Sequence, residues 1–155
     1  MQLSETYHLG EIDQIAFVVN NLDIALPTYT PLFGSFKSVL LPNIPVVYRD
    51  KETSIALKMA FWKNESLEIE IIEPVNKNGE TDFFGEHLKT HGKGLHHVKF
   101  KVKNLQETLR LMEADGYKNS DGDLSSDRPW ANIEVPDKLG HTLTELIEGS
   151  PSSTI

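Results

Sequence analysis

The fold is decided by the stretch Gly94-Leu95-His96-His97-Val98-Lys99-Phe100-Lys101-Val102. Its alternating polarity and its β-branched and aromatic side chains predict a half-buried strand. Apolar residues at helical spacing follow from Leu105, and Gly116 is expected to end that helix. A similar strand-to-helix pattern occurs once before, over residues 11–33. The sequence therefore predicts one module used twice.

The internal repeat rests on two matches that occur in the same order. Placing Gln14 over His97, an offset of 83 residues, also aligns apolar and capping positions of the same type. These further pairs are Ile15 with Val98, Phe17 with Phe100, Val19 with Val102, Asn21 with Asn104 and Leu22 with Leu105. The closing strands match at an offset of 75, with Glu70-Ile71-Ile72-Glu73 over Glu145-Leu146-Ile147-Glu148. Two ordered matches favour a genuine duplication, with a shorter second module.

Each copy reads as a β-α-β-β-β module within an α+β fold. In the first copy Pro42-Asn43 is expected to be a turn between two short strands, and in the second copy residues 119–128 are expected to be mostly loop. We expect one domain over residues 1–155, with the following parts: module one at about 10–75, a connector at 76–93, module two at about 94–148, and a Ser/Pro-rich tail at 149–155.

Composition narrows the function classes. The chain of 155 residues has a formal net charge of −8, which argues against nucleic acid as the main partner because phosphate binding needs a basic face. It has no cysteine, so disulfides and thiolate ligands are excluded. The first residues resemble no signal peptide, and no apolar run approaches the roughly 20 residues of a membrane span. We therefore expect a soluble cytoplasmic protein that does not bind a membrane.

Two glutamates stand out because strand alternation places them beside apolar residues. Glu70 and Glu145 occupy repeat-equivalent positions, and a buried carboxylate is costly unless it is paired or bound to a cation. This predicts a shared metal site. The alternatives are that both are surface residues, that Gln14 is an ordinary hydrogen-bonded strand residue, and that His97 is structural. The other strand glutamates, at positions 68, 73 and 148, are expected to be solvated partners or edge charges, and His96 is expected to point to the opposite face, where it packs or forms a structural hydrogen bond.

At this point the sequence resembles the vicinal oxygen chelate superfamily, also described as the glyoxalase, bleomycin resistance and dioxygenase superfamily. Four segments carry the resemblance, and they are Ile12–Leu22, Leu67–Pro74, Gly94–Val102 and Thr144–Glu148. The resemblance implies two βαβββ modules that form a curved mixed sheet around a metal-centred cleft. It also implies a homodimer.

Carried over position by position, the resemblance implies that Gln14, Glu70, His97 and Glu145 bind a divalent metal ion. The repeat register selects His97 rather than His96. One imidazole, one amide and two carboxylates suit Zn, Co, Ni or Mn without choosing among them. A metal-bound carbonyl acidifies the neighbouring C–H bond. The resemblance implies that Glu145 is the primary base and that Glu70 is its catalytic counterpart.

The identity of the residue at position 14 affects which branch of the family the sequence resembles. The histidine pair looks like methylmalonyl-CoA epimerase, and this favours a metal-dependent isomerase or epimerase that acts on a small carbonyl or acyl-thioester substrate. The epimerase group usually carries a histidine at the position of Gln14, and the Gln-Glu-His-Glu set instead resembles glyoxalase I, a lactoylglutathione lyase. Residues 15–20 contain no arginine for a glutathione carboxylate. The third alternative is a non-enzymatic small-molecule binding or resistance protein of the same fold.

Overall fold

A computed structural model describes residues 4–76, 82–134 and 143–149 of the chain. The expected tail at 150–155 and part of the expected connector, residues 77–81, lie outside these ranges. Within them the structure has eight strands and three helices. The strands are β1 (Leu9–Val18), β2 (Lys37–Tyr48), β3 (Lys51–Lys63), β4 (Glu68–Pro74), β5 (Gly94–Val102), β6 (Lys118–Asp123), β7 (Trp130–Glu134) and β8 (Leu143–Glu148). The helices are α1 (Leu22–Phe33), α2 (Phe83–His91) and α3 (Leu105–Ala114).

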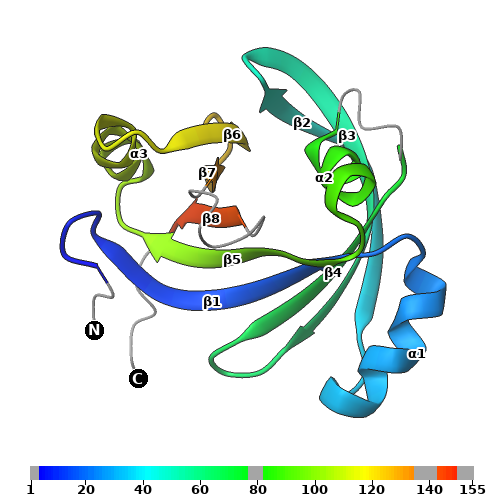
Figure 1. Cartoon of the computed structure of the whole chain (residues 1–155). Coiled ribbons are helices and arrows are strands. Elements are labelled where there is room, and N and C mark those ends of the chain that lie inside the picture. Colours follow the sequence, from blue (N-terminus) through cyan, green and yellow to red (C-terminus); the bar gives the residue numbers. More distant parts are fainter. Residues whose placement is uncertain (1–3, 77–81, 135–142, 150–155) are drawn as a thin grey trace.

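The strands form one mixed sheet that closes into a barrel in the order β1-β4-β3-β2-β6-β7-β8-β5 (Figure 1). Each half of the barrel has the same internal order, because β1-β4-β3-β2 is matched by β5-β8-β7-β6. The predicted α+β fold and the duplicated β-α-β-β-β connectivity are therefore confirmed. The expected curved sheet is wrapped further than predicted, into a closed barrel.

Two predictions about strands were wrong. The segment Pro42-Asn43 is not a turn, because β2 runs through it and absorbs it as an irregularity in the pairing with β3 between Leu41 and Ile44. Residues 118–123 form β6 rather than loop, although the segment is polar. It pairs with β7 and with the end of β2, so tertiary pairing overrides its weak strand propensity.

The helices begin at caps that are visible in the sequence. Asn21 caps α1 and Asn104 caps α3, each accepting a backbone N–H with its side-chain oxygen, and these two residues are equivalent in the repeat. Asp82 caps α2, the helix of the connector, in the same way. Gly34 and Gly92 follow α1 and α2 with positive φ angles, where a side chain would be strained.

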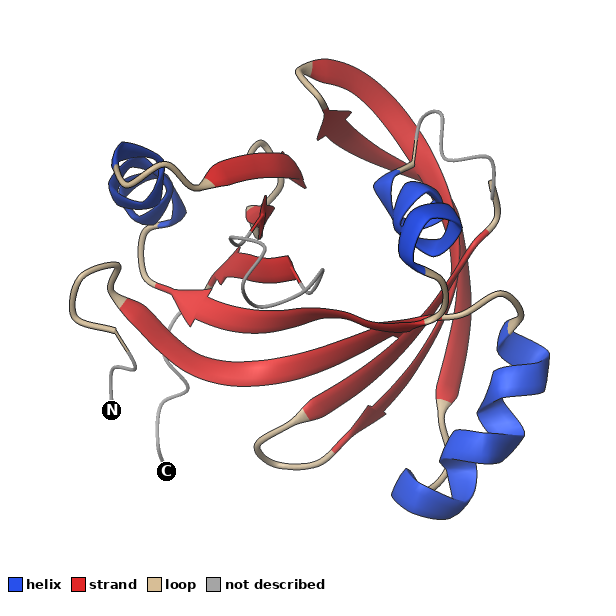
Figure 2. Cartoon of the chain, in the orientation of Figure 1, coloured by secondary structure: helices blue, strands red, loops and turns tan. Residues whose placement is uncertain are grey.

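The helices lie on different sides of the sheet (Figure 2), and separate clusters of buried apolar residues accompany them. Leu22 of α1 packs with Ala60 and Ile71, and Leu105 of α3 packs with Leu146, so both helices cover outward faces of strands. Helix α2 instead places its phenylalanines against inward residues of the first half. This inner cluster comprises Ala16, Val46, Tyr48, Ile55, Leu57, Ile72, Phe83 and Phe84. None of the described helices is long and apolar enough to cross a membrane.

Candidate metal centre

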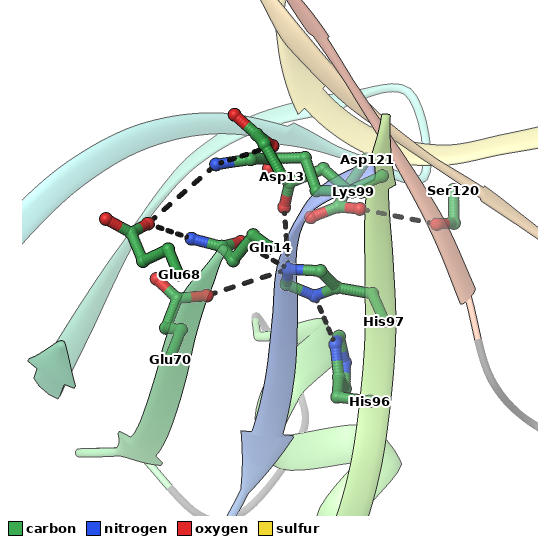
Figure 3. A network of polar contacts seen from close by, with 10 residues as sticks. Asp13, Gln14, Glu68, Glu70, His96, His97, Lys99, Ser120 and Asp121 are labelled. Atoms are coloured by element: carbon green, nitrogen blue, oxygen red, sulfur yellow. Dashed lines mark hydrogen bonds and ion pairs between the residues drawn. The ribbon is translucent and has the colours of Figure 1, made fainter. Parts of the chain in front are cut away.

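The four predicted ligands come together inside the barrel. The Nε2 atom of His97 lies 3.1 Å from Gln14 Oε1, 3.2 Å from Glu145 Oε2 and 3.6 Å from Glu70 Oε2. Gln14 comes from β1, Glu70 from β4, His97 from β5 and Glu145 from β8. Figure 3 shows the imidazole with the Gln14 amide and the Glu70 carboxylate beside it.

Strand register explains this convergence. The parallel pair β1–β4 sets Ala16, two residues after Gln14, beside Glu70. The parallel pair β5–β8 sets Lys99, two residues after His97, beside Glu145. Because side chains two residues apart share a face, each module presents its ligand pair to the same side of the sheet. The antiparallel seam between β1 and β5 then brings the two ligand pairs together.

Burial sets the electrostatics of the ligand set. Loss of water raises the pKa of Glu70 well above its usual range, and the nearby charge of Glu145 raises it further. Loss of water likewise raises the pKa of Glu145 to about 7, although Lys99 opposes this. Burial lowers the pKa of His97 to about 3, with a smaller effect from Lys99. At neutral pH the imidazole is therefore uncharged and leaves the carboxylates uncompensated.

A second group of charged side chains surrounds the ligands and was largely missed from the sequence. Glu68 Oε1 accepts a hydrogen bond of 2.6 Å from Gln14 Nε2, which turns the amide oxygen of Gln14 toward His97. Lys99 Nζ lies 3.6 Å from Asp13 and 3.9 Å from Glu68. The expectation that Glu68 is solvated was wrong. Strand alternation already put it on the same face as Glu70, and that signal could have identified it.

Glu73 and Glu148 also depart from the expected solvated role. The Glu73 carboxylate is buried and accepts the Leu22 N–H at 2.8 Å, while Glu148 accepts the Leu105 N–H at 2.9 Å. Each glutamate thus binds the N-terminus of the helix in its own module, where unpaired N–H groups favour a carboxylate. The two contacts are equivalent in the repeat, because Glu73 aligns with Glu148 and Leu22 aligns with Leu105.

His96 faces away from the ligand set. Its ring packs between Phe83, Phe84 and His87, with centroid distances of 4.8, 4.8 and 4.6 Å. Its Nδ1 atom lies 2.9 Å from Nδ1 of His97 (Figure 3). The expected structural role of His96 thus includes direct contact with a predicted ligand.

The chemistry of the donor set fits a divalent cation. Four carboxylates, from Asp13, Glu68, Glu70 and Glu145, are accompanied by the ammonium groups of Lys99 and Lys101, so two negative charges lack a counter-charge when all are ionised. Metal–ligand bonds of about 2.0–2.2 Å place neighbouring donor atoms roughly 3–3.5 Å apart, which is close to the separations from His97 Nε2. Even so, within residues 4–76, 82–134 and 143–149 no group of three or more His, Cys, Asp or Glu side chains is already arranged to hold a metal.

The sequence match to a known family covers most of this barrel. The model of the Glyoxalase/Bleomycin resistance protein/Dioxygenase superfamily matches residues 13–129, more than half of the chain. The chain belongs to this superfamily. The family resemblance predicted from the sequence is thus confirmed. Among curated proteins, none matches the sequence.

Solved structures share the fold at low sequence identity. A hypothetical protein from Bacillus halodurans C-125 is 21% identical with a TM-score of 0.62, and the match covers 94% of this chain and 98% of that one. A methylmalonyl-CoA epimerase from Mycobacterium tuberculosis is 18% identical with a TM-score of 0.60, covering 96% and 93%. A variant of the Streptomyces coelicolor methylmalonyl-CoA epimerase, in complex with 2-nitronate-propionyl-CoA, is 18% identical with a TM-score of 0.60, covering 92% and 99%. These likenesses support the superfamily fold alone.

Proposed function

We propose that this protein is a metal-dependent isomerase or epimerase that moves a proton at the carbon beside a carbonyl group. The observation that carries the proposal is the convergence of Gln14, Glu70 and Glu145 on Nε2 of His97. Each module contributes one glutamate and one neutral side chain, which is the amide of Gln14 in the first module and the imidazole of His97 in the second. This arrangement supplies two carboxyl groups beside one reaction centre.

The two glutamates are suited to different halves of a proton transfer. With a pKa raised to about 7, Glu145 is partly ionised at neutral pH and can accept a proton. Burial and the charge of Glu145 raise the pKa of Glu70 well above its usual range, so this carboxyl group has a stronger affinity for a proton than an ordinary glutamate. Environments that push two neighbouring pKa values apart assign a base and an acid. We therefore assign Glu145 as the base and Glu70 as its counterpart.

Gln14, Glu70, His97 and Glu145 are the residues that would hold a divalent metal ion, of Zn, Co, Ni or Mn. When bound, such an ion polarises the substrate carbonyl and acidifies the adjacent C–H bond. The protein side chains do the rest, because Glu68 orients Gln14 and Lys99 favours the ionised form of Glu145.

Methylmalonyl-CoA epimerases among the structural neighbours make an acyl-thioester the first substrate to test. We propose a small carbonyl or acyl-thioester substrate on this basis. The single-domain division, the homodimer and the cytoplasmic location stay predictions.

The test has two parts. Protein purified without added metal is analysed for metal content and for thermal stabilisation by added Zn²⁺, Co²⁺, Ni²⁺ and Mn²⁺. We expect close to one equivalent of metal or a clear stabilisation. Incubation with methylmalonyl-CoA in D₂O is expected to place deuterium beside the thioester carbonyl. Only trace metal together with no stabilisation would reject the metal-dependent mechanism.

Two alternatives remain as separate outcomes. A non-enzymatic binding protein is favoured by the absence of a ready-made metal-binding group among the described side chains, and it predicts that Glu145→Gln leaves ligand affinity intact. A glyoxalase I-like lactoylglutathione lyase is favoured by the presence of Gln14 in the ligand set, and a hemithioacetal of glutathione tests it. Turnover of the hemithioacetal without exchange on the acyl-thioester would assign the protein to that branch.

A further inference from the structure

The contact between His96 and His97 joins two side chains that are both completely buried. Their Nδ1 atoms are 2.9 Å apart, a hydrogen-bond distance (Figure 3). A hydrogen bond between two ring nitrogens needs one N–H and one lone pair. Because a neutral imidazole carries a single N–H, one proton at this contact fixes where the other proton of each ring lies.

Only two arrangements satisfy this contact. When His96 Nδ1 carries the proton, His97 carries its own proton on Nε2, where Gln14 Oε1 and Glu145 Oε2 lie 3.1 and 3.2 Å away. When His97 Nδ1 carries the proton, Nε2 of His97 is bare and can bind a cation, and His96 must carry its proton on Nε2. The two Nε2 atoms are therefore always in opposite states.

The surroundings of His96 Nε2 distinguish these arrangements. Among the described residues this buried atom has no hydrogen-bond partner, and the neighbouring groups are the rings of Phe83, Phe84 and His87. A bare nitrogen is tolerated there more easily than an N–H, which keeps at most a weak contact with an aromatic face. Without a cation, the first arrangement is therefore favoured, because the His97 Nε2–H has oxygen acceptors.

We propose that His96 is a positioning residue whose tautomer is coupled to occupancy of the His97 Nε2 atom. This inference rests on the proposed metal site. When a cation takes the Nε2 lone pair, the proton on that atom leaves. The proton from His97 Nε2 goes to solvent, the proton between the rings passes from His96 Nδ1 to His97 Nδ1, and His96 Nε2 takes up one proton from solvent, so no net proton is released. Each ring carries one proton before and after, so the pair stays neutral.

In this coupling, the acceptor for the second N–H of His97 is an unusual one. Histidine ligands ordinarily donate their second N–H to a carboxylate, a carbonyl or water. Here the acceptor is a second imidazole, whose remaining N–H points into an aromatic cluster. Cation binding at His97 therefore changes the tautomer of His96, which lies on the α2 side of β5 and outside the set of predicted ligands.

Nitrogen-15 NMR of histidine-labelled protein tests the proposal directly, because it separates bare from protonated ring nitrogens. In metal-free protein we expect protons on His97 Nε2 and His96 Nδ1. Diamagnetic Zn²⁺ is expected to exchange both assignments, and a scalar coupling across the N–H···N bond is expected in both states. Zn²⁺ binding without a change at His96 overturns the coupling alone. Absence of Zn²⁺ binding overturns the proposed function, and the coupling to occupancy fails with it.

Variants give a second measurement. His96→Phe keeps a ring of similar volume but removes the acceptor for His97 Nδ1–H, so Zn²⁺ affinity is expected to fall about 10–100-fold. His96→Gln restores an acceptor and is expected to recover most of the affinity. His87→Phe is the matched control, because His87 touches the His96 ring and belongs to no part of the proposed ligand set. An unchanged affinity in folded His96→Phe, or an equal loss in His87→Phe, overturns the positioning role.

Discussion

The two modules share a scaffold but not a set of side chains. Both have the strand order in which the first strand pairs with the last, and both use a glutamate to bind the N-terminus of their helix. The ligand position is Gln14 in one and His97 in the other. Two residues further along, Ala16 beside Glu70 is matched by Lys99 beside Glu145. Duplication thus built a symmetric frame, and substitution at a few inward positions made it chemically asymmetric.

The difference shows how two equivalent glutamates come to have different pKa values. Lys99 lowers the pKa of both carboxyl groups, yet Glu145 reaches only about 7 while Glu70 rises well above its usual range. Glu70 additionally feels the charge of Glu145. The following experiments break or sharpen this comparison, in order of decreasing expected effect.

Replacing Glu145, the proposed base of the second module, is expected to have the largest effect. Glu145→Gln keeps the shape of the side chain but cannot accept a proton, so deuterium exchange into an acyl-thioester is expected to slow by about 10²–10⁴-fold. Glu70→Gln, at the equivalent position, is the matched comparison and tests whether both glutamates are needed. Exchange by Glu145→Gln within a few-fold of the unaltered protein would contradict the assignment.

Exchanging the two ligand side chains tests the symmetry of the frame. His97→Gln removes the one imidazole of the proposed ligand set, and Zn²⁺ affinity is expected to fall by at least about 10–100-fold, the range seen for losing merely an outer partner. The double variant Gln14→His with His97→Gln moves the imidazole to the first module. If the frame is symmetric, titration calorimetry will show that much of the affinity returns. A double variant as weak as His97→Gln would mean that the modules are not interchangeable.

The helix-binding glutamates offer a comparison by stability. Glu73→Ala leaves the buried Leu22 N–H without its acceptor, and urea unfolding is expected to show a loss of about 1–3 kcal/mol. Glu148→Ala acts at a more exposed site and is expected to cost about 0.5–1.5 kcal/mol. Glu65→Ala, in an exposed turn, is the control and is expected to stay within about 0.5 kcal/mol. Equal losses at all three positions would refute the anchoring role.

The last comparison concerns the helix cap of the connector, where the expected effect depends on pH. Asparagine caps both repeated helices, but buried Asp82 caps α2, and burial raises the pKa of Asp82 to about 6. Because the folded state binds this proton more tightly than the unfolded state, the contribution is most favourable below the ordinary value of 3.8. It is lost as pH rises through about 6.

Asp82→Asn keeps the cap and removes this charge. Relative to the variant, the unaltered protein is expected to lose about 1–2 kcal/mol between pH 4 and pH 7, after allowance for solvent screening. Urea unfolding of both proteins across that range measures the difference. A difference that does not change with pH, or one that grows in the opposite direction, would contradict the raised pKa.

The sequence was most informative where the repeat could be compared with itself. The repeat aligned Gln14 with His97 and Glu70 with Glu145, and the family resemblance implied that these four side chains form one ligand set. The parallel pairs β1–β4 and β5–β8 explain why they meet. The same comparison did not reveal that Glu73 binds a helix N-terminus. Such a contact depends on the angle between helix and sheet, which no periodicity encodes.

Other features were not predictable because they depend on partners distant in the chain. Strand β6 is polar and is a strand because β7 and β2 supply hydrogen bonds. Closure of the barrel likewise depends on the curvature of both modules. The hydrogen bond from Gln14 to Glu68 lay within reach of strand alternation. It was not predicted because Glu68 lies in a segment rich in glutamate, a pattern that is typical of exposed residues.

Closure of the barrel has a consequence for access to its interior. The β2–β6 seam joins the halves through two register pairs, Val47–Gly122 and Tyr48–Asp121, while the β1–β5 seam runs along most of both strands. The four strands that carry the proposed ligands are consecutive across the β1–β5 seam, in the order β4-β1-β5-β8. Parting of the short seam would therefore turn the barrel into an open sheet without separating any two of these strands. The strands that carry the proposed ligands thus lie on the side of the barrel opposite its shortest seam.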